Sequence, residues 1–465
     1  MTASGPRPGH DAGQTHGHTH DPDALAALDA DVRVSARARS VLVAVLAVLG
    51  LLTVLGLVVT WPSGDASTRG GSTAFVASGA GTTGATVLST LPACPPETTD
   101  PALDPALDPA LDPGTSTTEP GLQPGSTCGA MVVRVDPDAV PQGQATEQTV
   151  PLDGPVARSG LQAGDRVTLL AVGGDDGQPT AYSFLEVQRS APLLFLLVLF
   201  VVVVGVVARL RGILALVGLG VGGVVVVTYL LPALLEGRSG IVVALVGSAA
   251  IMYVVLYLAH GLSVRTSTAL AGTLFGVAIT AGLGVLAIGW ARLSGVGDDE
   301  GATLTAVQQS LQPRELLTAA IIIAGLGVLN DVTITQSSAV WELRAAAPSL
   351  GRRQLFASGM RIGRDHIAST IYTIVFAYAG AALPVLLLLY VYDRPVLDML
   401  QTESLSQEIV RTLASAIGLV LAVPATTAIA ALTVGDATVA PTDDHDDHDD
   451  DEPSPSEASS AAQTD

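Results

Sequence analysis

Long runs of apolar residues constrain this sequence more than any other feature. A helix of about 20 apolar residues is long enough to cross the hydrocarbon core of a bilayer. Only 14% of the 465 residues are charged, well below the quarter that is typical of soluble proteins. We therefore expect a membrane protein rather than a soluble enzyme. The runs of sufficient length are residues 41–61, 191–208, 212–235, 241–259, 267–290, 316–336, 367–391 and 409–434.

The arginines predict how these runs cross the membrane. Arginine and lysine are enriched in cytoplasmic loops, and Arg33, Arg37 and Arg39 lie just before the first run, which favours a cytoplasmic N-terminus. Forty residues precede that run, so we expect an uncleaved anchor rather than a signal peptide. Eight crossings then place both termini in the cytoplasm and residues 62–190 outside the cell membrane. The short loops predicted on the cytoplasmic side contain Arg209, Arg211, Arg265, Arg344, Arg352, Arg353, Arg361 and Arg364.

The fold class that we predict is an all-α polytopic membrane bundle of about eight transmembrane helices. A small extracytoplasmic β-barrel-like domain of the SH3 or OB kind is expected between the first and second helices. Residues 131–135, 166–172 and 181–187 are short β-type runs separated by turn residues. The predicted parts are a His-rich tail 1–40, the first helix 41–61, a spacer 62–130, the β domain 131–190, a seven-helix core 191–434 and an acidic tail 435–465.

The spacer is rich in proline, glycine, serine and threonine. Within it the tetrapeptide Pro-Ala-Leu-Asp recurs through residues 100–113, and proline at this spacing predicts an extended, semi-rigid segment. The only two cysteines, Cys94 and Cys128, flank this repeat. On the outside of the membrane they are able to form a disulfide, which we favour over two free thiols.

The two tails carry most of the histidines. Closely spaced imidazoles bind divalent transition metals such as zinc, nickel or copper, and both tails are predicted to face the same compartment. Acidic, aromatic-poor segments are normally disordered, and we favour disordered tails without a specific ligand over a metal site. No other cofactor is predicted. The sequence has no basic face for nucleic acid, and its net charge is −21. The histidines are His10, His16, His18, His20, His445 and His448.

One acidic residue lies inside a predicted span. Asp331 is about five residues past the midpoint of the run 316–336, which is within the hydrocarbon at 1.5 Å per residue. An isolated carboxylate at this depth costs several kcal/mol, so it must be neutral, paired or beside water. Asn330, Thr333, Thr335 and Gln336 are its nearest polar neighbours in sequence.

The start of the next span carries a polar stripe at helical spacing, formed by His366, Ser369, Thr370 and Thr373. The two spans are antiparallel, so Asp331 is expected to be level with Thr370 and Thr373. We predict a polar seam from the cytoplasm to about mid-bilayer, which is typical of an ion or solute pathway. A hydrogen-bonded structural cluster is the alternative. The predicted seam and its two ends comprise Asp331, Asn330, Thr335, Gln336, Glu342, Asp365, His366, Ser369, Thr370, Thr373 and Arg411.

The final third of the chain carries a set of specific motifs. They are Gly327-x-x-x-Asp331, Ser338-Ala-x-x-Glu342, Gly359-x-x-x-Gly363-x-Asp365, Thr370-x-x-Thr373, Tyr378-x-Gly380, Pro384, Glu408-x-x-Arg411, Gly418 and Pro424. In these motifs the chain resembles the YibE/F family of multi-spanning bacterial membrane proteins, and the resemblance extends from about residue 131 to residue 434. It implies a permease, in which Glu342, Asp365 and His366 would lie at the cytoplasmic mouth of the seam and Arg411 at the outer end of the last helix.

Two functions remain open at this point. The first is a permease or ion-coupled transporter of a small solute or ion, using the seam around Asp331. The second is a non-transporting scaffold that binds partners through its outer β domain and its tails. An enzyme is not expected, because the sequence has neither His-Glu-x-x-His nor Gly-x-Ser-x-Gly, and Asp365 belongs at the interface, away from Asp331. The expected partners are the lipid bilayer, an unidentified solute or ion and, in a homo-oligomer, further copies of this chain.

Overall fold

The computed structural model describes residues 34–63, 80–92, 129–137, 140, 145–172, 180–297, 299–308, 310–392 and 395–435. They belong to two compact units. The first, here the bundle unit, combines Met1–Thr60, Ser239–Asp298 and Pro313–Asp465. The second, here the sheet unit, combines Trp61–Arg238 and Asp299–Gln312. The tail histidines, the Pro-Ala-Leu-Asp repeat, Cys94 and Cys128 lie outside the described residues.

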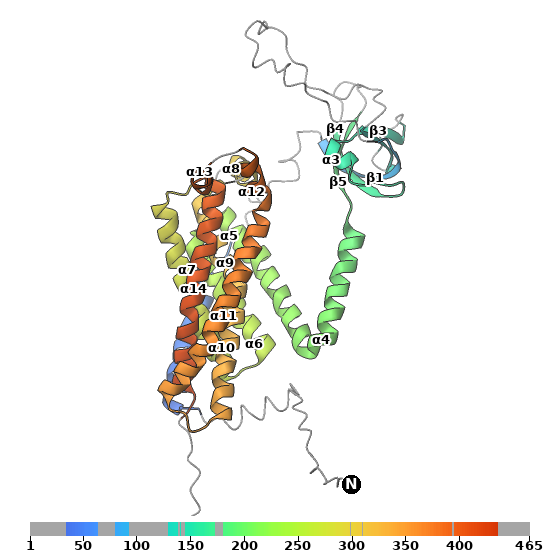
Figure 1. Ribbon diagram of the computed structural model, residues 1–465. Helices are drawn as coiled ribbons and strands as arrows, with labels where there is room; N and C mark the ends of the chain where they lie inside the picture. Colours follow the sequence, from blue (N-terminus) through green and yellow to red (C-terminus); the bar gives the residue numbers. More distant parts are fainter. Residues whose placement is uncertain are drawn as a thin grey trace, which may run out of the picture. The chain divides into compact units, whose positions relative to one another are not determined.

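Five antiparallel strands form a curled half-barrel in the sheet unit, in the order β3-β2-β1-β4-β5 (Figure 1). Their inward side chains make one apolar core in which Val87, Val133 and Leu169 are almost completely buried. A single turn of helix, α3 (Gly154–Ala157), follows β3. The strands are β1 (Ala80–Thr90), β2 (Ala130–Val135), β3 (Glu147–Pro151), β4 (Arg166–Val172) and β5 (Ala181–Val187). The three strands predicted from sequence are therefore confirmed as β2, β4 and β5.

The central strand β1 lies inside the segment that was predicted to be a spacer. It pairs with β2 on one edge and β4 on the other, so the half-barrel depends on it. Its sequence, Ala-Gly-Thr-Thr-Gly-Ala-Thr-Val-Leu-Ser-Thr, consists mainly of small residues and lacks the bulky alternation that marks a strand. Tertiary pairing decides its structure instead, and the sheet begins well before the predicted boundary at residue 131.

The β1–β2 ladder continues to the edge of the segment that contains both cysteines. The Leu91 N–H donates to the Ala130 carbonyl at 2.8 Å, and the Gly129 N–H donates to the Pro92 carbonyl at 2.7 Å. Residues 92 and 129 thus lie side by side. The disulfide itself stays a prediction, because both cysteines lie outside the described residues.

The sheet unit also contains the longest apolar helix. Helix α4 (Ser190–Val225) leads through η5 (Val226–Leu230) into α5 (Leu231–Leu235), and α8 (Asp299–Val307) belongs to the same unit. Within α4, Arg209 has the non-helical angles φ 52° and ψ −140°, and the helix turns sharply there (Figure 1). This break coincides with the Arg209-Leu210-Arg211 segment that separates two of the predicted spans.

The Glu236 carboxylate joins the beginning and the end of the segment Trp61–Arg238. Glu236 Oε1 accepts hydrogen bonds from the Ser63 N–H at 2.7 Å and the Ser63 hydroxyl at 2.9 Å, and Arg238 contacts Glu236 Oε2 at 3.2 Å. Burial raises the pKa of Glu236, but these hydrogen bonds and the charge of Arg238 outweigh it and hold the pKa below its usual value. The segment after α2 is therefore tied to the end of α5.

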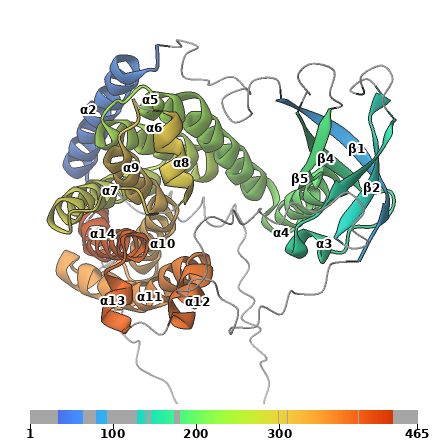
Figure 2. The same cartoon turned by 90° about the horizontal axis from the view of Figure 1, so that it is seen from above.

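The bundle unit is entirely helical in the part that the structure describes, apart from one isolated bridge. Helix α14 lies between α7 and α11, with α10 beside it (Figure 2). The helices are α2 (Ala36–Thr60), α6 (Gly240–His260), α7 (Val264–Trp290), α9 (Pro313–Ala324), α10 (Leu326–Ala346), α11 (Arg352–Ala381), α12 (Leu383–Val391), α13 (Val396–Leu400) and α14 (Glu403–Thr433).

Several of these helices are long and apolar enough to cross a membrane, so the chain is a multi-pass membrane protein. Among the described residues there are six such helices, or seven if α11 and α12, bent by 60° at their junction, count as one broken span. This count treats Ser190–Leu235 as one span of 46 residues. Large apolar side chains on α2 and α4 are exposed, among them Leu51 at 69% and Val207 at 77%, as expected for helices that face lipid.

Helices α7 and α14 make the closest contact in the bundle. They are antiparallel, because Gly272 lies against Thr426, Gly276 against Ala422, and Thr280 against Gly418. A Cβ atom at Gly272 or Gly418 would overlap the facing threonine hydroxyl. The Gly272-x-x-x-Gly276 pair is therefore a packing motif that lets two helix backbones approach closely.

The two ends of the described bundle meet. Val34 and Val434 form an isolated antiparallel bridge, and the Ser35 N–H donates to the Thr433 carbonyl at 2.9 Å. The beginning of α2 and the end of α14 consequently lie on the same side of the bundle, as an even number of crossings requires.

Candidate functional site

The buried and exposed faces of α10 separate the predicted seam into two groups. Buried residues recur at helical spacing along one face, and they include Leu329, Val332, Gln336 and Val340. Asp331 and Glu342 are exposed on the opposite face. Within the part of the chain that the structure describes, the carboxylate of Asp331 has no hydrogen-bond or ion-pair partner.

Gln336 belongs to the packed side and not to an open seam. Its side chain is 1% exposed, and its amide nitrogen donates to the Gly359 carbonyl at 2.9 Å and to Thr427 Oγ1 at 2.7 Å. Gly363 also packs directly against the Gln336 side chain. One buried amide, from a residue that the sequence predicts in the polar seam, therefore joins α10, α11 and α14.

Contacts on either side of Asp331 define its level along α11. Gln336 packs against Gly359 and Gly363, whereas Val328 shares a cavity with Thr373. Asp331 lies between these two levels on α10. It is therefore level with the α11 segment between Gly363 and Thr373, which includes Ser369 and Thr370, as antiparallel depth matching predicts.

The hydroxyl groups near this level bond to their own helices. Thr335 Oγ1 donates to the Asp331 carbonyl at 2.7 Å, Thr370 Oγ1 to the His366 carbonyl at 2.8 Å, and Thr373 Oγ1 to the Ser369 carbonyl at 3.3 Å. None of them neutralises the Asp331 carboxylate. Their second lone pairs remain available as acceptors for something else.

The remaining seam residues fall on both faces. Asp365, Ser369 and Thr373 are exposed on α11, His366 is half-buried, and Thr370 is buried. Asn330 Oδ1 is buried without a partner among the described residues. The structure thus gathers Asp331, Thr335, Glu342, Asp365, Ser369 and Thr373 on the partly or fully exposed side of α10 and α11.

A cavity of about 310 Å³ opens where α9 ends and α10 begins; we call it the Ser415 cavity. Ser415 is 2% exposed, and within the described chain its hydroxyl lies close to the Tyr378 phenol but makes no hydrogen bond of regular geometry. A buried hydroxyl without a partner costs about 1–3 kcal/mol, so it is normally satisfied. The cavity is lined by Ala324, Gly325, Val328, Thr373, Ile374, Ala377, Tyr378, Ala381 and Ser415.

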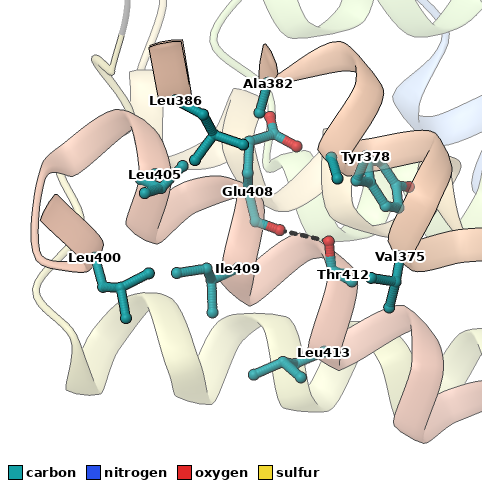
Figure 3. Close-up of a pocket in the computed structure, with 11 residues that line it drawn as sticks. Val375, Tyr378, Ala382, Leu386, Leu400, Leu405, Glu408, Ile409, Thr412 and Leu413 are labelled. Carbon is teal, nitrogen blue, oxygen red and sulfur yellow. Dashed lines mark hydrogen bonds between the residues drawn. The ribbon is translucent and has the colours of Figure 1, made fainter. Parts of the chain in front are cut away.

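A second cavity of about 250 Å³, here the Glu408 cavity, lies beside the break between α11 and α12 (Figure 3). Its wall is largely apolar, and Figure 3 shows the Glu408 carboxylate on the side where Ala382 and Leu386 lie. Glu408 Oε1 pairs with Arg411 at 2.6 Å. The residues that line it are Val375, Tyr378, Ala379, Ala382, Leu386, Leu400, Leu405, Glu408, Ile409, Thr412 and Leu413.

Tyr378 lines both cavities, and therefore connects them. Glu408 and Ser415 are seven residues apart, two helical turns, so α14 presents both toward α11. Sequence reasoning included Arg411 in the site but missed Tyr378, Glu408 and Ser415. The usable signals were the seven-residue spacing and the helix-breaking Pro384 just after Tyr378 in the chain.

Two further sequence features are described only in part. Among the described residues no group of three or more His, Cys, Asp or Glu side chains could hold a metal ion, and the tail histidines lie outside them. Residues 295–298 read Gly-Val-Gly-Asp, a sequence found in intramembrane aspartyl proteases; residues 295–297 follow the end of α7 outside any helix, and Asp298 lies outside the described residues. The Gly295 N–H donates to Glu403 there, at 3.2 Å.

Comparison with protein families identifies the helical part of the chain. A family described as YibE/F-like protein matches residues 196–436, more than half of the sequence. The match begins inside α4, so the half-barrel, which the resemblance was expected to include, lies outside it. Comparisons with curated proteins and with solved structures give no match.

Proposed function

The chain belongs to the YibE/F-like family, and we propose that it is a permease or ion-coupled transporter of a small solute or ion. Its route follows α10, α11 and α14, from Asp331 through the Ser415 cavity and past Tyr378 to the Glu408 cavity. Glu342, Asp365 and His366 form the cytoplasmic mouth in this proposal. Arg411 lies at the other end of the route.

One observation carries the proposal: Asp331 is an exposed carboxylate on a membrane-spanning helix and has no partner among the described residues. A carboxylate that faces hydrocarbon is costly, so such groups face water-filled cavities or permeating ligands. Transporters typically bind their substrates near the bilayer midplane at interrupted helices. The break at Gly325, one cavity and Asp331 lie within two turns of one another on α9 and α10.

The proposed membrane topology has eight crossings with both termini in the cytoplasm. Dividing Ser190–Leu235 at Arg209 gives two crossings, of about 28 and 39 Å at 1.5 Å per residue, instead of one of about 69 Å. A 69 Å helix is too long for a hydrocarbon core of about 30 Å. The meeting of Val34 with Val434 supports an even count. Residues 62–190, with the half-barrel, then lie outside.

The experiment is flux through the full-length protein in proteoliposomes. Swelling measured by light scattering with glycerol, urea and acetamide tests neutral solutes, and dye-reported fluxes of H⁺, Na⁺ and K⁺ test ions. We expect wild type to move at least one of these probes and Asp331→Asn to reduce that flux to the level of empty vesicles. The matched control is Asp398→Asn, an exposed carboxylate on α13.

The two variants decide the role of Asp331. Flux that Asp331→Asn leaves at the wild-type level would remove Asp331 from the mechanism. Equal loss in Asp398→Asn would show a general effect of surface charge and not of the route.

A scaffold that binds partners is the second candidate. It is supported by the half-barrel, which has an apolar core of its own and lies outside the family match. In this case deleting residues 80–189 would abolish function, whereas Asp331→Asn would change only stability. Affinity purification from native membranes distinguishes the two, because a stoichiometric partner lost with the half-barrel favours the scaffold.

A further inference from the structure

The ion pair on α14 is incompletely satisfied. Arg411 contacts Glu408 Oε1 at 2.6 Å, yet Glu408 Oε2 and Arg411 Nε are both buried and have no partner within the described chain. Ion pairs at low dielectric are stabilising only when their remaining lone pairs and N–H groups are also bonded. This pair therefore lacks two of the bonds that would make it a purely structural feature.

The surroundings of Glu408 Oε2 restrict what it can bind. Alkali and alkaline-earth ions need several oxygen ligands, about six to eight for calcium and six for magnesium. Here the wall consists mainly of leucine, isoleucine, valine and alanine side chains. The nearest hydroxyl on the same helix, Thr412 Oγ1, donates to the Glu408 carbonyl at 2.8 Å (Figure 3). A proton needs only one lone pair and no coordination shell.

We propose that Glu408 is the site that takes up and releases the coupling proton of this transporter. The inference rests on the proposed permease function for its meaning, although proton binding is measurable without transport. A proton that enters on Oε2 converts the carboxylate to a carboxylic acid, no other bond changes, and the pair changes from net neutral to +1. Arg411 is the positioning residue that holds the deprotonated form.

Few other charged groups face this carboxylate. The one ionisable side chain that α11 contributes to the cavity wall is Tyr378, and α12 contributes none. On α13, Asp398 is exposed and does not line the cavity. On α14, Glu403 is one turn away and is engaged by Gln407 at 2.9 Å. Asp393 and Arg394, between α12 and α13, lie outside the described residues.

The position of Glu408 connects protonation to the solute route. Tyr378 borders the Glu408 cavity on one side and the Ser415 cavity on the other. A charge change at the Glu408–Arg411 pair therefore occurs next to a residue that also contacts the space proposed for the solute. Asp331 lies beyond the Ser415 cavity on α10, so the two carboxylates occupy opposite ends of the route.

Carbodiimide labelling of the full-length protein in lipid nanodiscs tests the proton site directly. Dicyclohexylcarbodiimide reacts with protonated carboxyl groups in apolar surroundings, and peptide mass spectrometry identifies the labelled residue. Between about pH 9 and about pH 5 we expect labelling of Glu408 to rise at least tenfold, because the reagent modifies the carboxyl group that has taken up the proton and not the carboxylate. Asp398, exposed on α13, should remain unlabelled throughout and serves as the internal control.

Variants connect the label to flux. Glu408→Gln should lose the label and the pH dependence of flux. Glu408→Asp, which preserves the charge, should restore a pH dependence and guards against a folding defect in the first variant. Labelling that is absent, or that does not change with pH, overturns the proposal.

Two more outcomes have a defined meaning. Protection of Glu408 from the label by NaCl, but not by choline chloride, would assign the site to sodium and overturn the proton. If wild-type protein moves no probe yet Glu408 labels with the expected pH dependence, the permease proposal fails and the proton site stands.

Discussion

Helix α14 has two regions of opposite character. On the side of α7 its small residues leave no space, because Gly418 and Thr426 fit against Thr280 and Gly272. On the side of α11 the C-terminal half of α14 is also close-packed, because Thr427 and Val423 fit against Gly359 and Gly363. Its N-terminal half borders two cavities there and carries Glu408 and Ser415, whose hydroxyl has no partner among the described residues. A close-packed region and a loosely packed one therefore share a single helix.

The buried hydroxyls of the two regions differ less than their packing. Thr426, which faces Gly272 on α7, donates to the Ala422 carbonyl at 2.8 Å. Thr280 on α7 and Ser415 on α14 are both buried without a hydrogen-bond partner among the described residues, but Thr280 is packed against Gly418 whereas Ser415 borders a cavity. Of these two hydroxyls, the one at Ser415 has space beside it for a solute. Comparing substitutions in the two regions tests this division.

The largest loss of stability is expected at the close contact between α7 and α14. Gly272→Leu inserts a side chain where even a Cβ atom would overlap Thr426, so the helices must separate. Overpacking of this kind costs about 3 kcal/mol or more, and we expect a lower melting temperature or loss of monodisperse protein. Gly282→Leu is the matched control on the same helix, because no atom lies within 4 Å of its Cβ position.

Thermal unfolding of the detergent-solubilised protein, followed by size-exclusion chromatography, measures both variants. Equal destabilisation by Gly272→Leu and Gly282→Leu would mean that α7 and α14 are not packed as described.

Substitution of Gln336, whose buried amide joins α10, α11 and α14, should cause an intermediate loss of stability. Gln336→Leu keeps a similar volume but removes the hydrogen bonds to the Gly359 carbonyl and Thr427 Oγ1. Unsatisfied buried groups cost about 1–3 kcal/mol, so we expect a loss near 2 kcal/mol. Thr335→Val is the control, since that hydroxyl bonds only within α10. Flux lost at an unchanged melting temperature would instead return Gln336 to the solute route.

The sequence predicts the helices better than their contacts. Hydropathy places every described apolar helix, and Arg209-Leu210-Arg211 coincides with the break in α4. The strands β2, β4 and β5 follow from alternation and turn residues. Strand β1 does not, because its small residues become a strand only through pairing with β2 and β4.

Helical periodicity identifies a polar stripe but not the neighbour that each member faces. Asp331 and Gln336 are five residues apart and both polar, yet one is exposed and the other is enclosed by α11 and α14. The Ser415 and Glu408 cavities depend on two helix breaks, and each cavity is lined by four helices. The seven-residue spacing along α14 therefore could not by itself show that Ser415 and Tyr378 border a cavity.

The smallest change in stability, and the sharpest contrast, is expected from paired alanine substitutions on α14. Ser415→Ala removes a buried hydroxyl that has no partner in the described chain, so the melting temperature should stay constant or rise by the equivalent of about 1 kcal/mol. Thr426→Ala opens a gap against Gly272 and should lower stability by about 1 kcal/mol. For the solute probe that wild type transports, we expect the reverse order, with flux reduced by Ser415→Ala and retained by Thr426→Ala. This result would identify the Ser415 hydroxyl as a solute-binding group. Its hydrogen bond would then be made with the solute, so the group would be needed for flux and not for stability. If Ser415→Ala instead loses stability and keeps full flux, Ser415 is a structural residue and the Ser415 cavity is not on the route.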